Sequence, residues 1–172
     1  LIAAAKAPNQ RITLVHRMRE ELTVGETHYF LSTQEFADGT APEEGYRNLC
    51  FFTYDNVPHW RYHIAGVRVT RTMAMTYGQN TTAVLYRVEN QSGDPCTLTV
   101  TPFVKFAPKE QALQAPPPLA FDGSKITCGP YALHIAATGQ LRQIPQETQL
   151  LAYPEDAKDG RSPQGLAAAV CQ

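Results

Sequence analysis

The chain has 172 residues, of which 43% are hydrophobic and 18% are charged, and its formal net charge is −1. This length and composition fit one globular domain with a single hydrophobic core, and they exclude an intrinsically disordered chain. A charge so close to zero provides no basic field that would attract nucleic acid or anionic lipid. We therefore predict neither nucleic acid nor a membrane as a partner.

Targeting and cysteine signals indicate a cytoplasmic protein without a cofactor. No apolar run approaches the ~20 residues that span a bilayer, and Lys6 interrupts the apolar start of the chain too early for a signal peptide. The cysteines include no C-x-x-C pair, which argues against structural zinc, although an even number would permit disulfides. We expect four reduced, mostly buried thiols: Cys50, Cys96, Cys128 and Cys171.

Alternation with a period of two dominates the chain and predicts strands with one buried face. The clearest case is the segment 67–77, in which apolar side chains fall on one side and Arg71 is the exception. In chain order, the pattern predicts strands over residues 12–22, 27–32, 60–64, 67–77, 81–88, 97–106, 119–121, 125–128, 131–137, 140–144 and 166–170.

The breaks between these runs have the chemistry of tight turns. Ala65-Gly66 and Asp122-Gly123 each fit a two-residue hairpin. No window of a dozen residues has a helical stripe. The fold class is therefore predicted to be all-β, an antiparallel β-sandwich or barrel that forms one domain over residues 1–172.

Signatures of catalysis or metal binding do not emerge from the residue spacing. His59 and His63 are four residues apart, which on a strand means ~13 Å, too far to share one metal ion. Neither a nucleophile elbow nor a phosphate-binding glycine loop occurs. We interpret the paired acids as solvated surface groups and predict no catalytic residue: Glu20-Glu21, Glu43-Glu44 and Glu155-Asp156.

Aromatic side chains gather between residues 46 and 62, with arginines among them. Sugars stack on aromatic rings and accept hydrogen bonds from arginine, whereas rings also dominate protein cores by area. We expect Phe51 and Phe52 to be core or interface rings. The candidate sugar-contacting residues are Tyr46, Arg47, Trp60 and Arg61.

An ordered set of short motifs resembles a known family. The motifs are Pro42-Glu43-Glu44-Gly45-Tyr46-Arg47, Pro58-His59-Trp60-Arg61-Tyr62, Ile64-Ala65-Gly66-Val67, Gly78-Gln79-Asn80-Thr81-Thr82 followed by Val84, Tyr86 and Arg87, Thr101-Pro102-Phe103, and Asp156-Ala157-Lys158-Asp159-Gly160-Arg161. Together they resemble the N-terminal domain of bacterial and archaeal glycogen debranching enzymes of the amylo-α-1,6-glucosidase type. The resemblance covers nearly the whole chain, and its specificity lies in the order of the set.

The resemblance implies an antiparallel β-supersandwich, similar to the N-terminal domains of bacterial glucoamylases. In the intact enzymes this domain precedes a helical (α/α)6 barrel, whose carboxylates hydrolyse the α-1,6 branch glucose. The barrel is not among these 172 residues, so we expect this chain alone to be inactive. The implied partners are the enzyme's own C-terminal catalytic domain and an α-glucan such as glycogen or a maltooligosaccharide. A barrel-facing apolar surface would also allow a homodimer of the isolated chain.

Two other functions stay open at this point. A free-standing carbohydrate-binding module would bind glucan without the barrel and would lose affinity on Trp60→Ala. A small sugar-active enzyme, such as an epimerase, would turn over a monosaccharide and would need a converging pair of a histidine and a carboxylate.

Overall fold

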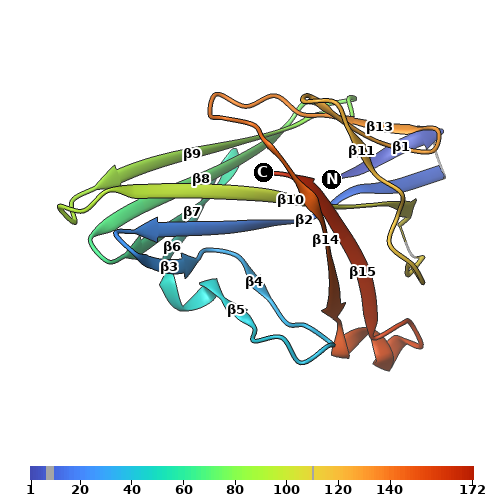
Figure 1. The fold of residues 1–172 in the computed structure, drawn as a ribbon, viewed down its shortest axis with the longest axis horizontal. Helices are drawn as coiled ribbons and strands as arrows, with labels where there is room; N and C mark the ends of the chain where they lie inside the picture. Colours follow the sequence, from blue (N-terminus) through green and yellow to red (C-terminus); the bar gives the residue numbers. More distant parts are fainter. Residues whose placement is uncertain (7–9, 110) are drawn as a thin grey trace. The chain divides into compact units, whose positions relative to one another are not determined.

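The computed structural model describes residues 1–6, 10–109 and 111–172 (Figure 1). Within these ranges the chain forms fifteen β-strands and two short 3-10 helices, so the predicted all-β class is confirmed. The strand pairs whose register the structure defines are antiparallel. Over the same residues, none of the helical segments has the length and apolar character needed to cross a membrane.

The strands are β1 (Ile2–Lys6), β2 (Gln10–Val24), β3 (Thr27–Phe30), β4 (Thr33–Gln34), β5 (Glu43–Glu44), β6 (Leu49–Asp55), β7 (Val57–Ile64), β8 (Val67–Met75), β9 (Thr82–Asn90), β10 (Cys96–Pro108), β11 (Ala120–Phe121), β12 (Lys125–Cys128), β13 (Tyr131–His134), β14 (Gln143–Ala152) and β15 (Gln164–Cys171). Short turns join most of the strands, whereas longer connections precede β5, β11, β14 and β15. The 3-10 helices are η1 (Gly45–Asn48) and η2 (Pro154–Asp159).

The chain divides into two compact units. The first comprises Leu1–Met18, Gln34–Pro42 and Val100–Gln172, and the second comprises Arg19–Thr33 and Glu43–Thr99. Strands β2 and β10 therefore contribute residues to both units. The supersandwich arrangement and the single domain over residues 1–172 stay predictions.

The first unit is built from the sheet order β1-β2-β10-β15-β14 and a separate sheet β11-β12-β13. Side chains of β10 are buried on both faces: Val104 belongs to a core cluster with Ile126, and Phe103 belongs to another with Leu151. Strand β15 contributes small residues, and Ala168 pairs with Val104 across the two strands. A strand that is buried on both faces contains a continuous apolar run, which explains the composition of β15.

The second unit centres on the four-stranded sheet β6-β7-β8-β9. The turn Ala65-Gly66 joins β7 to β8, and both residues have positive φ (47° and 79°), the conformation of a type I′ hairpin turn. One face of this sheet packs onto β2 and β3 in a core that comprises Leu22, Val24, Leu31, Tyr62, Ile64, Val67 and Val69. The predicted hairpin and the buried face of its two strands are thus confirmed.

The sequence pattern missed β1, β4 and β5, and it extended β13 three residues beyond its end at His134. Three further differences concern β6, β14 and β8. Strand β6 was not predicted, because Phe51 and Phe52 are adjacent and do not alternate with polar residues. Strand β14 begins at Gln143, so most of it lies beyond the predicted segment 140–144. Residues 76 and 77, predicted as the end of a strand, lie outside β8, which ends at Met75.

Candidate functional site

The predicted glucan-contacting residues lie on two elements of the second unit. Tyr46 and Arg47 belong to η1, whereas Trp60 and Arg61 belong to β7. Helix η1 begins at Gly45, whose N–H donates to the carbonyl of Ser32 at 2.9 Å. A Cβ atom on this glycine would lie 2.1 Å from the carbonyl oxygen of Leu31, so only glycine permits this close approach.

Tyr46 and Arg47 form a compact polar group with Glu44. The Arg47 guanidinium binds both carboxylate oxygens of Glu44, at 3.0 Å from Nη2 and 2.9 Å from Nε, and its Cζ lies 5.7 Å from the centroid of the Tyr46 ring. The Tyr46 hydroxyl donates to the same carboxylate at 3.2 Å. These hydrogen bonds hold the pKa of Glu44 below its usual value, and the bond from Arg47 has the largest effect. Tyr46 is 56% exposed, so its ring is available to a ligand.

Trp60 and Arg61 face opposite sides of the sheet because they are neighbours on a strand. Trp60 pairs with Phe52 on β6 and with Arg71 on β8, whereas Arg61 pairs with Phe51 and Thr70. The structure therefore does not bring the two predicted residues into one site.

The Trp60 indole is half-buried between two neighbours. The Arg71 guanidinium lies over it, 4.3 Å from Cζ to the ring centroid, and the Phe52 ring lies 5.4 Å away at an interplanar angle of 54°. Trp60 also packs against the core of the second unit. Its neighbour Phe52 presents the more accessible ring, 51% exposed.

Glu20 holds the arginine that stacks on Trp60. Its carboxylate is 1% exposed and accepts hydrogen bonds from Arg71 Nη1, at 2.6 Å, and from the hydroxyl of Tyr86. Burial raises the pKa of Tyr86, and the adjacent carboxylate raises it further. A buried carboxylate needs such a cation and donors to remain ionised.

The interpretation of the paired acids as solvated groups is wrong for two residues. Glu20 is buried as described, and Glu43 is 4% exposed and accepts a hydrogen bond from Ser32 Oγ at 2.6 Å. Residue spacing gave no signal for either, because the donors are distant in the sequence: Arg71 and Tyr86 for Glu20, and Ser32 for Glu43.

The aromatic rings of β6 are exposed. Phe51, Phe52 and Tyr54 are 53%, 51% and 72% exposed. Of the two positions expected for the phenylalanines, core or interface, the core is thus wrong within the described chain and the interface stays a prediction. β6 is an edge strand, with only β7 as a neighbour in its sheet. A strand without a second neighbour has less protein around its side chains, which is why rings there remain open to solvent.

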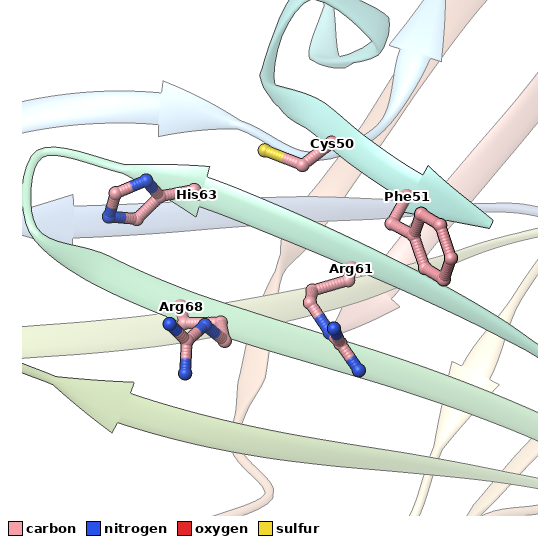
Figure 2. Close-up of a pocket in the computed structure, with 5 residues that line it drawn as sticks. All are labelled: Cys50, Phe51, Arg61, His63 and Arg68. Carbon is pink, nitrogen blue, oxygen red and sulfur yellow. The ribbon is translucent and has the colours of Figure 1, made fainter.

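A cavity of about 470 Å³ opens on the face of the sheet that carries Arg61. Its lining residues are Cys50, Phe51, Arg61, His63 and Arg68 (Figure 2). Figure 2 shows that they come from three adjacent strands, with the two arginine side chains directed to the same side. None of the lining residues is acidic. Sequence reasoning found only Arg61 of this group, because the others meet through strand register.

The histidines do not form a metal or catalytic cluster in the described residues. His59 and His63 lie on β7, as predicted, and His59 Nδ1 lies 2.8 Å from Thr72 Oγ1. His28 Nδ1 lies 2.5 Å from Glu21 Oε1, but the histidine side chain is 62% exposed on the β2–β3 hairpin. No group of three or more His, Cys, Asp or Glu side chains lies close enough to hold a metal ion in the part of the chain that the structure describes.

The four cysteines are free. Cys171 is buried and Cys50 is exposed, whereas Cys96 and Cys128 are intermediate. The expectation that most of these thiols are buried holds fully only for Cys171, and their reduced state stays a prediction.

The comparisons with known proteins gave one match. A family model described as "Glycogen debranching enzyme N terminal" matches residues 1–169. Neither the search of curated proteins nor the search of solved structures gave a significant match.

Proposed function

The chain belongs to the family of glycogen debranching enzyme N-terminal domains, and on that premise we propose that it is a non-catalytic domain of a debranching enzyme. The enzyme as a whole would hydrolyse the α-1,6 branch glucose, with the carboxylates of a helical C-terminal domain as catalysts. This chain would pack on that domain and contact the α-glucan next to it.

The observation that carries the proposal is the exposure of aromatic rings over η1 and β6. Tyr46, Phe51, Phe52 and Tyr54 are each more than half exposed. Because neighbours on a strand face opposite sides, Phe51 lies on one face of β6, whereas Phe52 and Tyr54 share the other. Exposed apolar groups that share a face are the kind of feature that marks a binding or interaction surface. Rings of this kind suit both tasks, because they stack on the C–H faces of glucose and also pack against another domain.

We assign glucan contact to η1 and to β6, the edge strand that follows it. Tyr46 offers an accessible ring, and Arg47 is oriented beside it by Glu44. Trp60 would contribute indirectly, since its ring is covered by Arg71 and supports Phe52. Arg61 lies on the other face of the sheet and would reach a different part of the ligand.

Calorimetry of the 172-residue chain with maltoheptaose and glycogen tests the glucan contact, with dextran as the α-1,6-linked control. We expect α-1,4-glucan binding that weakens about fivefold or more in Tyr46→Ala, since a ring stack contributes about 1 kcal/mol beyond its buried area. Tyr77→Ala is the matched control, because Tyr77 is fully exposed (101%) and lies outside the segment. Equal affinities of the two variants would contradict the assignment.

Two further measurements separate the competing functions. Release of glucose from a branched glucan by this chain alone would contradict a non-catalytic role. Sedimentation velocity with and without the separately produced catalytic domain tests the packing of the two domains. Tyr54→Ser should weaken their complex. It should also weaken any homodimer that forms through the same rings. Strong glucan binding together with no binding to the catalytic domain would favour an autonomous carbohydrate-binding module.

A further inference from the structure

The cavity of about 470 Å³ lies on the face of the β6–β9 sheet that carries Arg61. Two arginines, one histidine and the ring of Phe51 line it, together with Cys50. The pair His63 and Arg68 are directly opposite each other on β7 and β8. Arg61 is two residues before His63 and therefore on the same face, and Phe51 lies opposite Arg61 on β6. Side chains in such positions have Cβ atoms about 5 to 8 Å apart, so the three nitrogen-bearing groups surround one small volume.

The charges around this cavity leave two positive charges uncompensated. Glu89 pairs with Arg68 at 2.8 Å and with Arg87 at 3.0 Å, so one carboxylate faces two guanidinium groups. Among the described residues Arg61 has no carboxylate partner. Three arginines and one glutamate therefore leave a net charge of +2.

Other groups on this face do not offset that charge. Asp55 has the same orientation as Phe51, but it lies four residues further along β6, ~13 Å away. His59 is bonded to Thr72, and Thr70 lies opposite Arg61. The neighbours of the cavity on this face are thus hydroxyl groups and histidine.

We propose that this cavity binds the phosphate of a phosphorylated glucose unit. A phosphomonoester carries close to two negative charges at neutral pH and has three acceptor oxygens. Guanidinium groups bind such oxygens through paired, charge-assisted hydrogen bonds. The two arginines that line the cavity, Arg61 and Arg68, supply these groups.

The sugar ring is assigned to the Phe51 wall. The Phe51 ring is 53% exposed, and the Arg61 guanidinium lies 5.7 Å from its centroid, so a phosphate on Arg61 places its sugar at the ring. All five lining residues are exposed, so the site is an open depression of about 470 Å³ on the sheet surface, which leaves room for a sugar beside the phosphate. The choice of glucose as the sugar rests on the proposed function, whereas the phosphate site does not.

The experiment is a calorimetric titration of the 172-residue chain with glucose 6-phosphate, inorganic phosphate, glucose and a phosphorylated α-glucan. We expect glucose 6-phosphate to bind more tightly than inorganic phosphate and glucose not to bind measurably. Arg61→Gln and Arg68→Gln should each weaken glucose 6-phosphate about tenfold, the typical effect of one charge-assisted hydrogen bond. Phe51→Ala should weaken glucose 6-phosphate and leave inorganic phosphate unchanged.

Arg11→Gln is the matched control. Arg11 is an exposed arginine of β2 in the first unit, so this variant loses the same charge without altering the cavity. Circular dichroism and the thermal midpoint of each variant verify that it is folded. An equal loss of affinity in Arg11→Gln would overturn the proposal, because the binding would then follow overall charge.

The remaining outcomes of these titrations also decide whether the cavity binds a phosphorylated sugar. The absence of saturable binding of both phosphates overturns the site, and equal affinity for inorganic phosphate and glucose 6-phosphate overturns its assignment to a sugar. Binding of polyglutamate without hexose phosphate binding reassigns the face to an acidic protein surface and likewise overturns the proposal. Preference for the phosphorylated glucan over glucose 6-phosphate identifies a polymer-borne phosphate as the source, and the reverse identifies a free hexose phosphate.

Failure of this proposal is distinguishable from failure of the proposed function. Maltoheptaose carries no charge, and its binding is assigned to Tyr46. Arg68→Gln should leave maltoheptaose binding unchanged while it weakens glucose 6-phosphate. Loss of one titration without the other therefore shows which assignment is wrong.

Discussion

The guanidinium of Arg71 lies 4.3 Å above the indole of Trp60, and it is held there by a 2.6 Å hydrogen bond to the buried carboxylate of Glu20. The contact links β2, β7 and β8. It also explains why an arginine occupies a position on the apolar side of β8: its charge is matched by Glu20, and its flat face covers a ring. The stability of the second unit should therefore depend on this pair.

Replacing Glu20 with glutamine should lower the free energy of unfolding by about 3 kcal/mol, since removal of one partner of a buried pair leaves the other charge uncompensated. Urea denaturation measures the effect. Glu89→Gln is the control, because Glu89 pairs with Arg68 on the exposed surface, where such pairs contribute about 0 to 1 kcal/mol. Equal unfolding midpoints for the two variants would refute the structural importance of Glu20.

Gly45→Ala should destabilise the chain by about 2 kcal/mol or more, because the new methyl group would lie 2.1 Å from the Leu31 carbonyl oxygen. The variant should also displace η1 and so reduce glucan affinity through Tyr46. Gly139→Ala provides the comparison, as a Cβ there has no neighbour within 4 Å and the glycine has no positive φ. Thermal unfolding of both proteins checks the prediction, and similar midpoints would argue against the close approach at Gly45.

Acid should destabilise the first unit through His16. Burial, followed by the positive charges of Lys105, the Leu1 amine and Arg17, lowers the pKa of His16 from 6.5 to about 4. A lowered pKa means that the unfolded chain binds the proton more readily, so stability is complete above pH 6.5 and falls as the pH decreases towards 4. The loss should be on the order of 3 kcal/mol.

His16→Gln should remove this part of the pH dependence. His16 Nε2 forms a hydrogen bond with the hydroxyl of Tyr153, and burial raises the pKa of Tyr153 to about 12, so the hydroxyl keeps its proton and can donate it. Glutamine can accept the same hydrogen bond. Urea midpoints between pH 4 and 7.5 provide the test, with the exposed His134→Gln as control; a slope in His16→Gln as steep as in the parent chain would count against it.

The cysteines should react in an order set by their burial. Cys50 is exposed, whereas burial raises the pKa of Cys171 to about 11, so little of it is thiolate at neutral pH. Iodoacetamide labelling followed by mass spectrometry should modify Cys50 first and Cys171 only after unfolding. Early labelling of Cys171 in the native chain would show that its strand opens readily.

Several features of the fold follow from local sequence because they depend on neighbouring residues alone. Alternation predicted β8 and the burial of Val67 and Val69, and Ala65-Gly66 predicted the turn before it. Alternation did not predict where burial ends along the strand. Met75 falls on the same side of the strand as Val67 and Val69, yet it is 65% exposed. The reason is that burial depends on which strands cover the sheet, and β2 and β3 reach only the first half of β8 in the core cluster.

In the candidate site, too, some features follow from local sequence and others from the tertiary structure. Local sequence identified the aromatic and cationic segment from Tyr46 to Arg61 and placed Trp60 and Arg61 on a strand, from which their opposite directions follow. Only the tertiary structure decided which rings are exposed and which charges meet. Arg68 joins Arg61 through the register of β7 and β8, and Glu20 reaches Arg71 across 51 positions of the chain. Pairing over such separations is determined by the packing of whole strands, which no local pattern encodes.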